Sequence, residues 1–297
     1  MDTIIKILKE NQLYDNNIKE VYINKKQEFL NNYKINKSSK NKIPNTIKRN
    51  NDGFLILDNE PYIISNLKEN GHNDKFWIIL SNGSRILLKD VTDDEIQNEL
   101  LFKYLCKWLD IPCANYDVCL FESEKYLISP SFLGINEYLF DYYNLNGKYH
   151  IKIDELLKDA SYIDQDSFVR KTLIVDMLTQ NQDRFPRNFK VIKNPKQIRI
   201  CPLFDNGILE INNEKLLFKI YPEINYSISD DDIACYLMQD NKFKQWCLNK
   251  IISRQIPNLR KQIYEDKKIY IDDEVFDSFN KSVYDGKALI LDNFKNN

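Results

Sequence analysis

The sequence predicts an α+β fold in which a strand-rich N-terminal part is followed by a mainly helical C-terminal part. Short apolar runs separated by turn residues dominate from Gly53 to Pro130, and longer runs with helical spacing dominate after Pro130. The chain has 297 residues, 43% of them hydrophobic, which is enough for one large domain or two packed lobes. Gly and Pro are scarce, which favours regular elements over loops.

The first fifty residues form a distinct basic segment. They contain eleven Lys or Arg against five Asp or Glu, and they end in the polar run NKSSKNKIPNTIKRNND, which predicts a linker. Residues 3–13 and 18–33 have the apolar spacing of helices. We expect a basic helical docking extension over residues 1–50. A small nucleic-acid-binding or partner-binding headpiece is the alternative.

The strand-rich part is expected over residues 51–130. The pair Asn82-Gly83 between two apolar runs predicts a hairpin. The sequence from Thr92 to Glu95 has a capping pattern and predicts the start of a helix that runs to Leu109. The predicted strands are FLIL, YIIS, KFWIIL, RILLKD, YDVCLF and KYLISP.

The C-terminal part, residues 131–297, is expected to be mainly helical. One β insertion, FKVI followed by QIRICPLF, interrupts it. The aromatic run Tyr138–Tyr143 is expected to pack at a helix end, with substrate contact as the alternative. Asp230 to Asp232 are expected to cap a helix. The predicted helices are 154–160, 165–179, 231–252, 257–265 and 273–283.

Composition narrows the class of protein. The formal net charge of -2 points to neither nucleic acid nor an anionic membrane as a partner. The six cysteines contain no CxxC pair, so we expect neither a disulfide framework nor a zinc site. The N-terminus lacks the apolar run of a signal peptide, and no later run approaches the roughly 18 residues of a membrane span. We expect a cytoplasmic protein with no membrane partner.

The most informative stretch is NQDRFPRNF, residues 181–189, which leaves a predicted helix and enters the β insertion. Asn188 follows Asp183 by five positions, and Asp205 lies in PLFDNG at the end of the insertion. Phosphoryl transfer needs a group that orients the acceptor hydroxyl and oxygen ligands that hold Mg²⁺. These three residues supply both. A turn at residues 205–207, formed for backbone reasons alone, is the alternative.

This pattern resembles the catalytic and metal-binding segment of HipA-like kinases, distant relatives of protein and phosphatidylinositol kinases. The resemblance implies a two-lobed protein-kinase-like fold over about residues 53–285. It also implies that Asp183 and Asn188 are catalytic, and that Asn188 and Asp205 bind Mg²⁺. The family usually has His two residues after its catalytic Asp, where this chain has Phe185. That departure leaves the ligands intact.

A kinase also needs a basic residue that reaches the nucleotide phosphates and a carboxylate that orients it. Lys89, at the end of a predicted strand, and Glu99, in the following helix, meet these needs. Glu95 is the alternative to Glu99. An exposed hairpin-end lysine and a solvated helix face are the structural alternatives.

The remaining nucleotide contacts are expected from position in the resemblance. The loop of residues 65–74 is the candidate phosphate cover, but it has only Gly71 and lacks GxGxxG, so a plain surface loop is the alternative. The adenine ring is expected against residues 128–132, with Ser129 and Phe132 among its contacts. Arg184 and Arg187 are expected to have structural or surface roles, with phosphate binding as the alternative.

The sequence therefore predicts an ATP- and Mg²⁺-dependent serine/threonine protein kinase. The resemblance further implies autophosphorylation and a toxin-type role in growth arrest, with an antitoxin partner. Its protein substrate would be of the kind that some family members phosphorylate, a translation factor or an aminoacyl-tRNA synthetase. A pseudokinase that serves as a binding scaffold, and a lipid or small-molecule kinase, are the alternatives.

Overall fold

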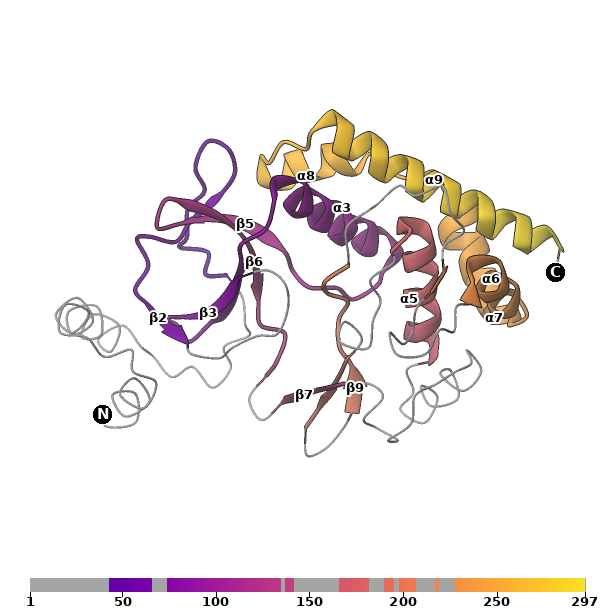
Figure 1. Cartoon of the computed structure of the whole chain (residues 1–297), viewed down its shortest axis with the longest axis horizontal. Coiled ribbons are helices and arrows are strands. Elements are labelled where there is room, and N and C mark those ends of the chain that lie inside the picture. The colour runs from indigo at the N-terminus through magenta and orange to yellow at the C-terminus, as the bar shows by residue number, and fades with distance from the viewer. Residues whose placement is uncertain are drawn as a thin grey trace. The chain divides into compact units, whose positions relative to one another are not determined.

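The computed structural model describes residues 43–65, 74–134, 137–141, 166–181, 190–194, 198–206, 217–218 and 228–296 (Figure 1). The chain divides into two compact units. Unit 1 takes the described residues within 43–50, 55–90 and 118–131, and unit 2 takes the others. Most of the predicted basic extension and the predicted helix 154–160 lie outside the described residues. The domain boundaries expected at residues 50 and 130 stay a prediction.

Unit 1 is built on a six-stranded sheet with the order β1-β5-β6-β4-β3-β2. Strands β1 and β5 pair in parallel, whereas β2 with β3, β3 with β4 and β4 with β6 pair antiparallel. Each strand falls on a run that the sequence predicts. The bounds are β1 Leu55–Ile56, β2 Tyr62–Ser65, β3 Lys75–Leu80, β4 Arg85–Lys89, β5 Asp117–Phe121 and β6 Glu124–Pro130.

The turn between β3 and β4 confirms the predicted hairpin. Gly83 has a φ of 85°, a left-handed conformation that favours glycine. Its N–H donates to the Leu80 carbonyl at 2.8 Å, and the Ser84 N–H donates to Asn82 Oδ1 at 2.9 Å. The turn therefore satisfies its own polar groups and fixes the register of the two strands.

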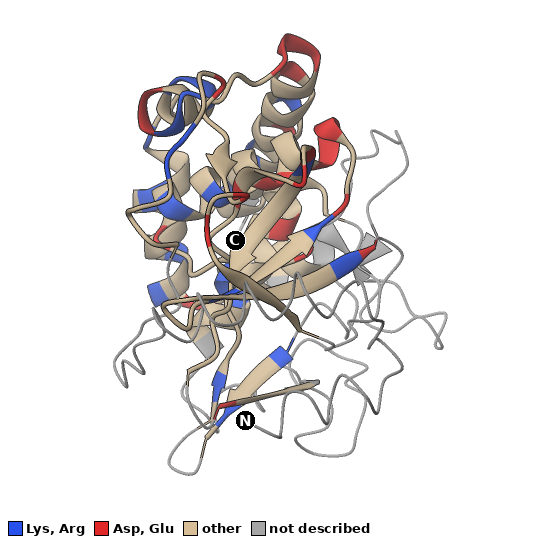
Figure 2. Ribbon diagram, turned by 90° about the vertical axis from the view of Figure 1, so that its left-hand side faces the viewer, with Lys and Arg blue, Asp and Glu red and all other residues tan. Residues whose placement is uncertain are grey.

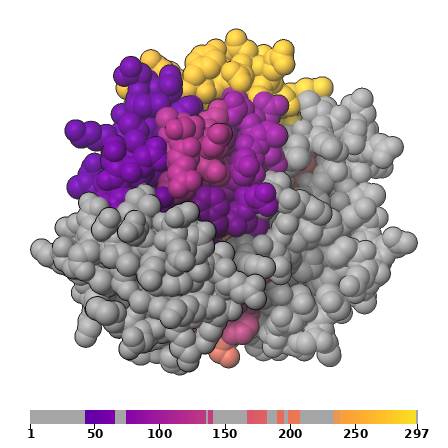
Figure 3. Space-filling view, turned by 60° about the vertical axis from the view of Figure 1, so that its left-hand side comes forward, coloured from indigo at the N-terminus to yellow at the C-terminus, as the bar shows by residue number. Residues whose placement is uncertain are grey.

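The two faces of this sheet differ in character. Successive side chains of a strand point to opposite faces, so Trp77, Leu87 and Ser129 share the face that does not carry the core. Residues from this part of the chain, indigo to magenta in Figure 3, reach the surface on the side shown there. The core face holds Ile47, Leu55, Leu57, Ile78, Leu80, Ile86, Leu88, Cys119, Phe121 and Ile128.

Helix α3 (Asp93–Leu109) begins with the predicted capping box. The Glu95 N–H donates to the Thr92 hydroxyl at 3.3 Å, and the Thr92 N–H donates to the Glu95 carboxylate at 2.9 Å. The helix ends at Asp110 in a left-handed conformation. Within unit 2 its buried face packs against α8 (Leu259–Lys267) and α9 (Asp273–Asn296) (Figure 1).

The other helices of unit 2 correct one prediction. Residues 231–252 do not form a single helix, because Asp240 accepts a hydrogen bond from the Phe243 N–H at 2.9 Å and so caps a new helix. Lys and Arg, blue in Figure 2, and Asp and Glu, red there, both occur along the described chain, in keeping with the small net charge. The bounds are α5 Asp166–Thr179, α6 Asp230–Met238, α7 Asn241–Cys247 and the π-helix η3 Leu248–Ile252.

Unit 2 also contains a three-stranded antiparallel sheet of β7 (Tyr138–Asp141), β8 (Lys190–Lys193) and β9 (Ile198–Ile200). Strands β8 and β9 confirm the predicted insertion. The expectation of a helix end at Tyr138–Tyr143 is wrong, because residues 138–141 pair with β8 far along the chain. Two short strands, β10 (Leu217–Phe218) and β11 (Ile228–Ser229), also pair antiparallel. No helix within the described ranges is both long and apolar enough to cross a bilayer.

Gly286 lies where α9 packs against α5, and its lack of a side chain permits that packing. A Cβ there would lie 2.6 Å from the Met177 carbonyl oxygen and 2.7 Å from Leu178 Cα. We expect Gly286→Ala to lower the free energy of unfolding by about 1–3 kcal/mol, although Ala is the better helix former. Chemical denaturation measures the change. The neighbouring exposed substitution Asp285→Ala is the control and should be nearly neutral. A Gly286→Ala protein of unchanged or higher stability would contradict the close packing.

A group of charged side chains is buried between α3, α8 and the start of β5. Lys267 Nζ lies 2.6 Å from Asp117 Oδ2, and both side chains are less than a tenth exposed. Lys103 Nζ donates to the Tyr116 carbonyl at 2.7 Å. Burial, and then the charge of Lys267, lower the pKa of Lys103 to about 8, while the charges of Asp117 and Asp266 act in the opposite direction.

The lowered pKa of Lys103 predicts a pH dependence of stability. Between about pH 8 and the ordinary lysine value of 10.5, the unfolded chain binds the proton and the folded chain does not. The free energy of unfolding should therefore rise with pH in this interval relative to Lys103→Met, by up to about 1 kcal/mol per pH unit. Denaturant titrations at several pH values test it. Lys107→Met, exposed on the same helix, is the control and should keep the wild-type dependence of the unfolding free energy on pH. A Lys103→Met protein with that same pH dependence would refute the effect.

Candidate functional site

In unit 1, two of the residues predicted to contact the nucleotide share one face of the sheet. Lys89 ends β4, is 7% exposed, and lies opposite Leu127 in β6. Ser129 lies two residues beyond Leu127 and is also buried, so the side chains of Lys89 and Ser129 share a face. Lys75 lies directly opposite Lys89 on β3.

In unit 2, Glu99 lies on the buried face of α3 and binds Asn206. Its carboxylate accepts from the Asn206 N–H at 3.2 Å and from Asn206 Nδ2 at 2.8 Å. Glu95, the alternative, is instead part of the capping box at the start of the helix. Lys89 belongs to unit 1, so the predicted ion pair of Lys89 with Glu99 stays a prediction.

Asp205 is held in an uncommon backbone conformation. Its φ is 46°, a left-handed value that costs a residue with a side chain of the order of 1 kcal/mol. The Asp205 N–H donates to the hydroxyl of Tyr116 at 3.0 Å. Burial raises the pKa of Tyr116 well above 10, and the charges of Glu99 and Asp205 raise it further, so this hydroxyl keeps its proton. A strained residue that several neighbours hold in place is typical of a functional site.

The segment that leads to Asp205 is fixed by an isolated parallel β-bridge between Leu203 and Cys113. The Ala114 N–H donates to the Leu203 carbonyl at 2.7 Å, and the Leu203 N–H donates to the Pro112 carbonyl at 3.0 Å. The chain segment that carries the Tyr116 hydroxyl therefore also lies alongside the residues before Asp205. As a result, the position of the Asp205 backbone is determined from two sides.

The predicted catalytic stretch begins and ends at anchored residues. Asn181 Nδ2 donates to Asp176 Oδ1 at 2.9 Å, and the Asn181 N–H donates to the Asp176 carbonyl at 2.9 Å. At the other end, the Cys201 N–H donates to the Lys190 carbonyl at 2.9 Å. The residues between, 182–189, lie outside the described part of the chain, as does residue 71. The roles of Asp183, Asn188, Arg184, Arg187 and Gly71 therefore stay predictions.

The predicted adenine segment leaves the sheet at Phe132. The Ser131 N–H still donates to the Arg85 carbonyl of β4 at 2.8 Å. The ring of Phe132 then lies 5.9 Å from that of Phe204, centroid to centroid, at an angle of 32°. Phe204 precedes Asp205, so within unit 2 Phe132 lies beside the residue before the predicted metal ligand.

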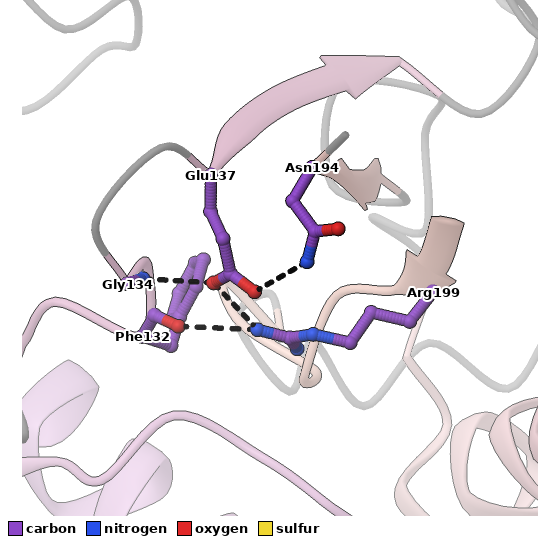
Figure 4. A network of polar contacts seen from close by, with 5 residues as sticks. All are labelled: Phe132, Gly134, Glu137, Asn194 and Arg199. Atoms are coloured by element: carbon purple, nitrogen blue, oxygen red, sulfur yellow. Dashed lines mark hydrogen bonds and ion pairs between the residues drawn. The ribbon is translucent and has the colours of Figure 1, made fainter. Parts of the chain in front are cut away.

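A polar network centred on Glu137 lies in the same region (Figure 4). The Glu137 carboxylate accepts from the Gly134 N–H at 2.7 Å, from the Arg199 guanidinium at 2.9 Å and from Asn194 Nδ2 at 3.5 Å. Arg199 also reaches the Phe132 carbonyl, at 3.5 Å. Burial alone raises the pKa of Glu137, but these hydrogen bonds and the Arg199 charge bring it below the ordinary value. Glu137 is thus ionised and fully bonded at neutral pH.

Comparison with known proteins supports the fold. No family model matches the sequence, and no curated protein matches it significantly. The Helicobacter pylori proinflammatory kinase CtkA aligns with a TM-score of 0.51 at 13% identity, over 82% of this chain and 97% of CtkA. The chain has the fold of this kinase. The predicted α+β, kinase-like fold is therefore confirmed.

A second structure aligns less well. A chain from the Shewanella oneidensis MR-1 toxin–antitoxin complex of HipA, HipB and operator DNA gives a TM-score of 0.49 at 16% identity. The match covers 77% of this chain and 65% of that one.

Sequence reasoning missed several residues that shape the site. No local pattern predicts a role for Tyr116, and the sequence around Asn206 predicts only a turn. Their partners lie 89 and 107 positions away along the chain, so no local pattern marks them. Arg199 and Glu137 are 62 positions apart and were missed for the same reason.

The contact between Glu99 and Asn206 predicts a specific effect of charge. Asn206→Asp would place two carboxylates together in a buried position, where one of them must take up a proton. We expect a loss of about 1–3 kcal/mol in the free energy of unfolding at pH 7. The loss should shrink as the pH falls toward 5, because the raised pKa of the shared site allows protonation. Denaturation at both pH values tests this.

Asn258→Asp is the matched control for that experiment. Asn258 caps α8, where its Oδ1 accepts from the Lys261 N–H at 2.9 Å, and Asp is an equally good cap. This variant should be as stable as the wild type. Equal stability of the two variants at pH 7 would rule out a buried contact at Asn206.

Proposed function

We propose that the chain is an ATP- and Mg²⁺-dependent serine/threonine protein kinase that transfers the γ-phosphate of ATP to a protein hydroxyl. The observation that carries the proposal is the strained backbone of Asp205, held by the Tyr116 hydroxyl next to the Glu99–Asn206 contact. The motif order Asp183, Asn188, Asp205 and the fold of the kinase CtkA support it.

In this proposal Asp205 and Asn188 hold the metal. Carboxylate and amide oxygens are the donors that Mg²⁺ prefers, so the residue types fit the ion. Bound Mg²⁺ would neutralise charge on the phosphate oxygens. Tyr116 and Glu99 fix the loop that carries Asp205 before any ligand arrives, so little ordering remains to be done on binding.

The other residues position the nucleotide and the acceptor. Asp183 would orient the acceptor hydroxyl and receive its proton. Lys89 would contact the phosphates, a role favoured by its burial on a sheet face where Lys75 lies opposite. The loop that contains Gly71 would cover them, and Ser129 and Phe132 would lie against the adenine.

The finer parts of the proposal concern biology. Autophosphorylation, a toxin-type role with an antitoxin partner and a cytoplasmic location follow from the motif resemblance. So does a substrate among translation factors or aminoacyl-tRNA synthetases. A result that contradicts one of these parts would not contradict the proposed phosphoryl transfer.

A transfer assay tests the proposed function. The purified chain is incubated with ATP labelled at the γ-phosphate and with Mg²⁺, alone and with cell extract. We expect label on protein, and a loss of at least about a hundredfold in Asp205→Ala and in Asp183→Ala, because each removes a group that acts on the reacting phosphate. Asp285→Ala, on the exposed side of α9, is the control and should keep full activity.

The other outcomes separate the alternatives. Nucleotide binding without transfer to any acceptor would favour a pseudokinase scaffold. Transfer to lipid or to a small molecule would favour the related lipid kinases. A chain that binds no nucleotide at all would overturn the proposal.

A further inference from the structure

We propose that Arg199 and Glu137 are positioning residues of the nucleotide site: they hold Phe132, the last residue of the predicted adenine segment, and the chain that follows it as far as Gly134. The inference rests on the proposed kinase function. Arg199 and Glu137 belong neither to the predicted catalytic motif nor to the predicted metal ligands.

One pair of side chains fixes both ends of this short segment. The Glu137 carboxylate accepts from the Gly134 N–H at 2.7 Å, and the Glu137 N–H donates back to the Gly134 carbonyl at 3.4 Å. Arg199 binds the same carboxylate at 2.9 Å and the Phe132 carbonyl at 3.5 Å. Figure 4 shows the guanidinium pointing at both acceptors. The segment is therefore held by the two hydrogen bonds between Gly134 and Glu137 and by the contact of Phe132 with Arg199 in β9.

The same strand leads to the predicted metal ligand. Arg199 lies in β9, and the chain continues from β9 through Phe204 to Asp205. The ring of Phe132 lies 5.9 Å from that of Phe204, which adds an aromatic contact to the polar one. A single stretch of chain, from β9 to Asp205, thus contacts Phe132 and carries Asp205, both within unit 2.

Ordering the segment before binding improves affinity. A nucleotide whose adenine lies against Phe132 must otherwise lose part of its binding free energy in ordering that residue. Both bonds come from the same guanidinium nitrogen, Nη2, so one donor group joins the Glu137 carboxylate and the Phe132 carbonyl. The Glu137 side chain is 13% exposed, so the ion pair is partly shielded from water. Removing Arg199 should therefore weaken the binding of every adenine nucleotide, with or without metal.

Direct binding measurements test the proposal. The full chain is titrated with ADP in the absence of Mg²⁺, by calorimetry, and KM and kcat for ATP are measured in the transfer assay. We expect Arg199→Ala to raise the Kd for ADP about tenfold or more, because part of the binding free energy would then be lost in ordering the segment. KM for ATP should rise by a similar factor while kcat at saturating ATP stays near the wild-type value. Arg199→Lys should lie between the two.

Arg260→Ala is the matched control. Its side chain is 32% exposed against 33% for Arg199, it forms an ion pair with Asp273, and it lies over the Phe276 ring, all within unit 2. It should leave Kd and KM unchanged. If Arg199→Ala does not fold, Glu137→Gln repeats the test, because it removes the charge and keeps an acceptor oxygen; it should raise Kd by a smaller factor.

The outcomes distinguish this inference from the proposed function. A wild-type chain that binds no adenine nucleotide refutes the kinase proposal and this inference with it. A wild-type chain that binds ADP, with folded Arg199→Ala or Glu137→Gln proteins binding equally well, overturns the inference alone. A fall in kcat with unchanged KM and Kd also overturns it, because the pair would then act on the chemical step and not on nucleotide binding.

Discussion

A buried carboxylate needs hydrogen-bond donors, and the donors that Glu99 finds on Asn206 are the constraint on which the rest of the site depends. Glu99 projects from α3, a helix capped at its start and packed against α8 and α9. Because this packing holds α3 in place, the hydrogen bonds of Glu99 also fix the position of the loop after β9. The Tyr116 hydroxyl holds the preceding residue, Asp205, so two neighbouring peptide units are fixed by partners from distant parts of the chain. Strain at Asp205 persists because these contacts outweigh it.

Elements with local causes could be predicted from the sequence. A glycine at a left-handed turn position specified the β3–β4 hairpin, and a hydroxyl followed by an acid three residues later specified the start of α3. Strand β7 could not be found this way, because its identity depends on pairing with β8. The break at Asp240 did carry a local signal, an N-cap residue inside a run of helical apolar spacing. The apolar spacing concealed it.

The residues of the candidate site also fall into two groups, those with a local sequence signal and those without one. Lys89, Glu99 and Asp205 were named from the order of residue types, and the structure adds the burial of the first two and the unusual backbone of the third. Tyr116 and Arg199 were not named, because what distinguishes them is a partner far away in the sequence. A motif identifies groups that touch a ligand. The residues that position these ligand-contacting groups depend on the tertiary structure, and many residue types can do so.

The anchoring of residues 181 and 190 has a consequence for the elements that they border. Asn181 is bound to Asp176 of the last turn of α5, and Lys190 is bound within the β8–β9 pair. Both sets of contacts are made without residues 182–189. A substitution in that stretch therefore removes none of the hydrogen bonds that end α5 or begin the strand pair.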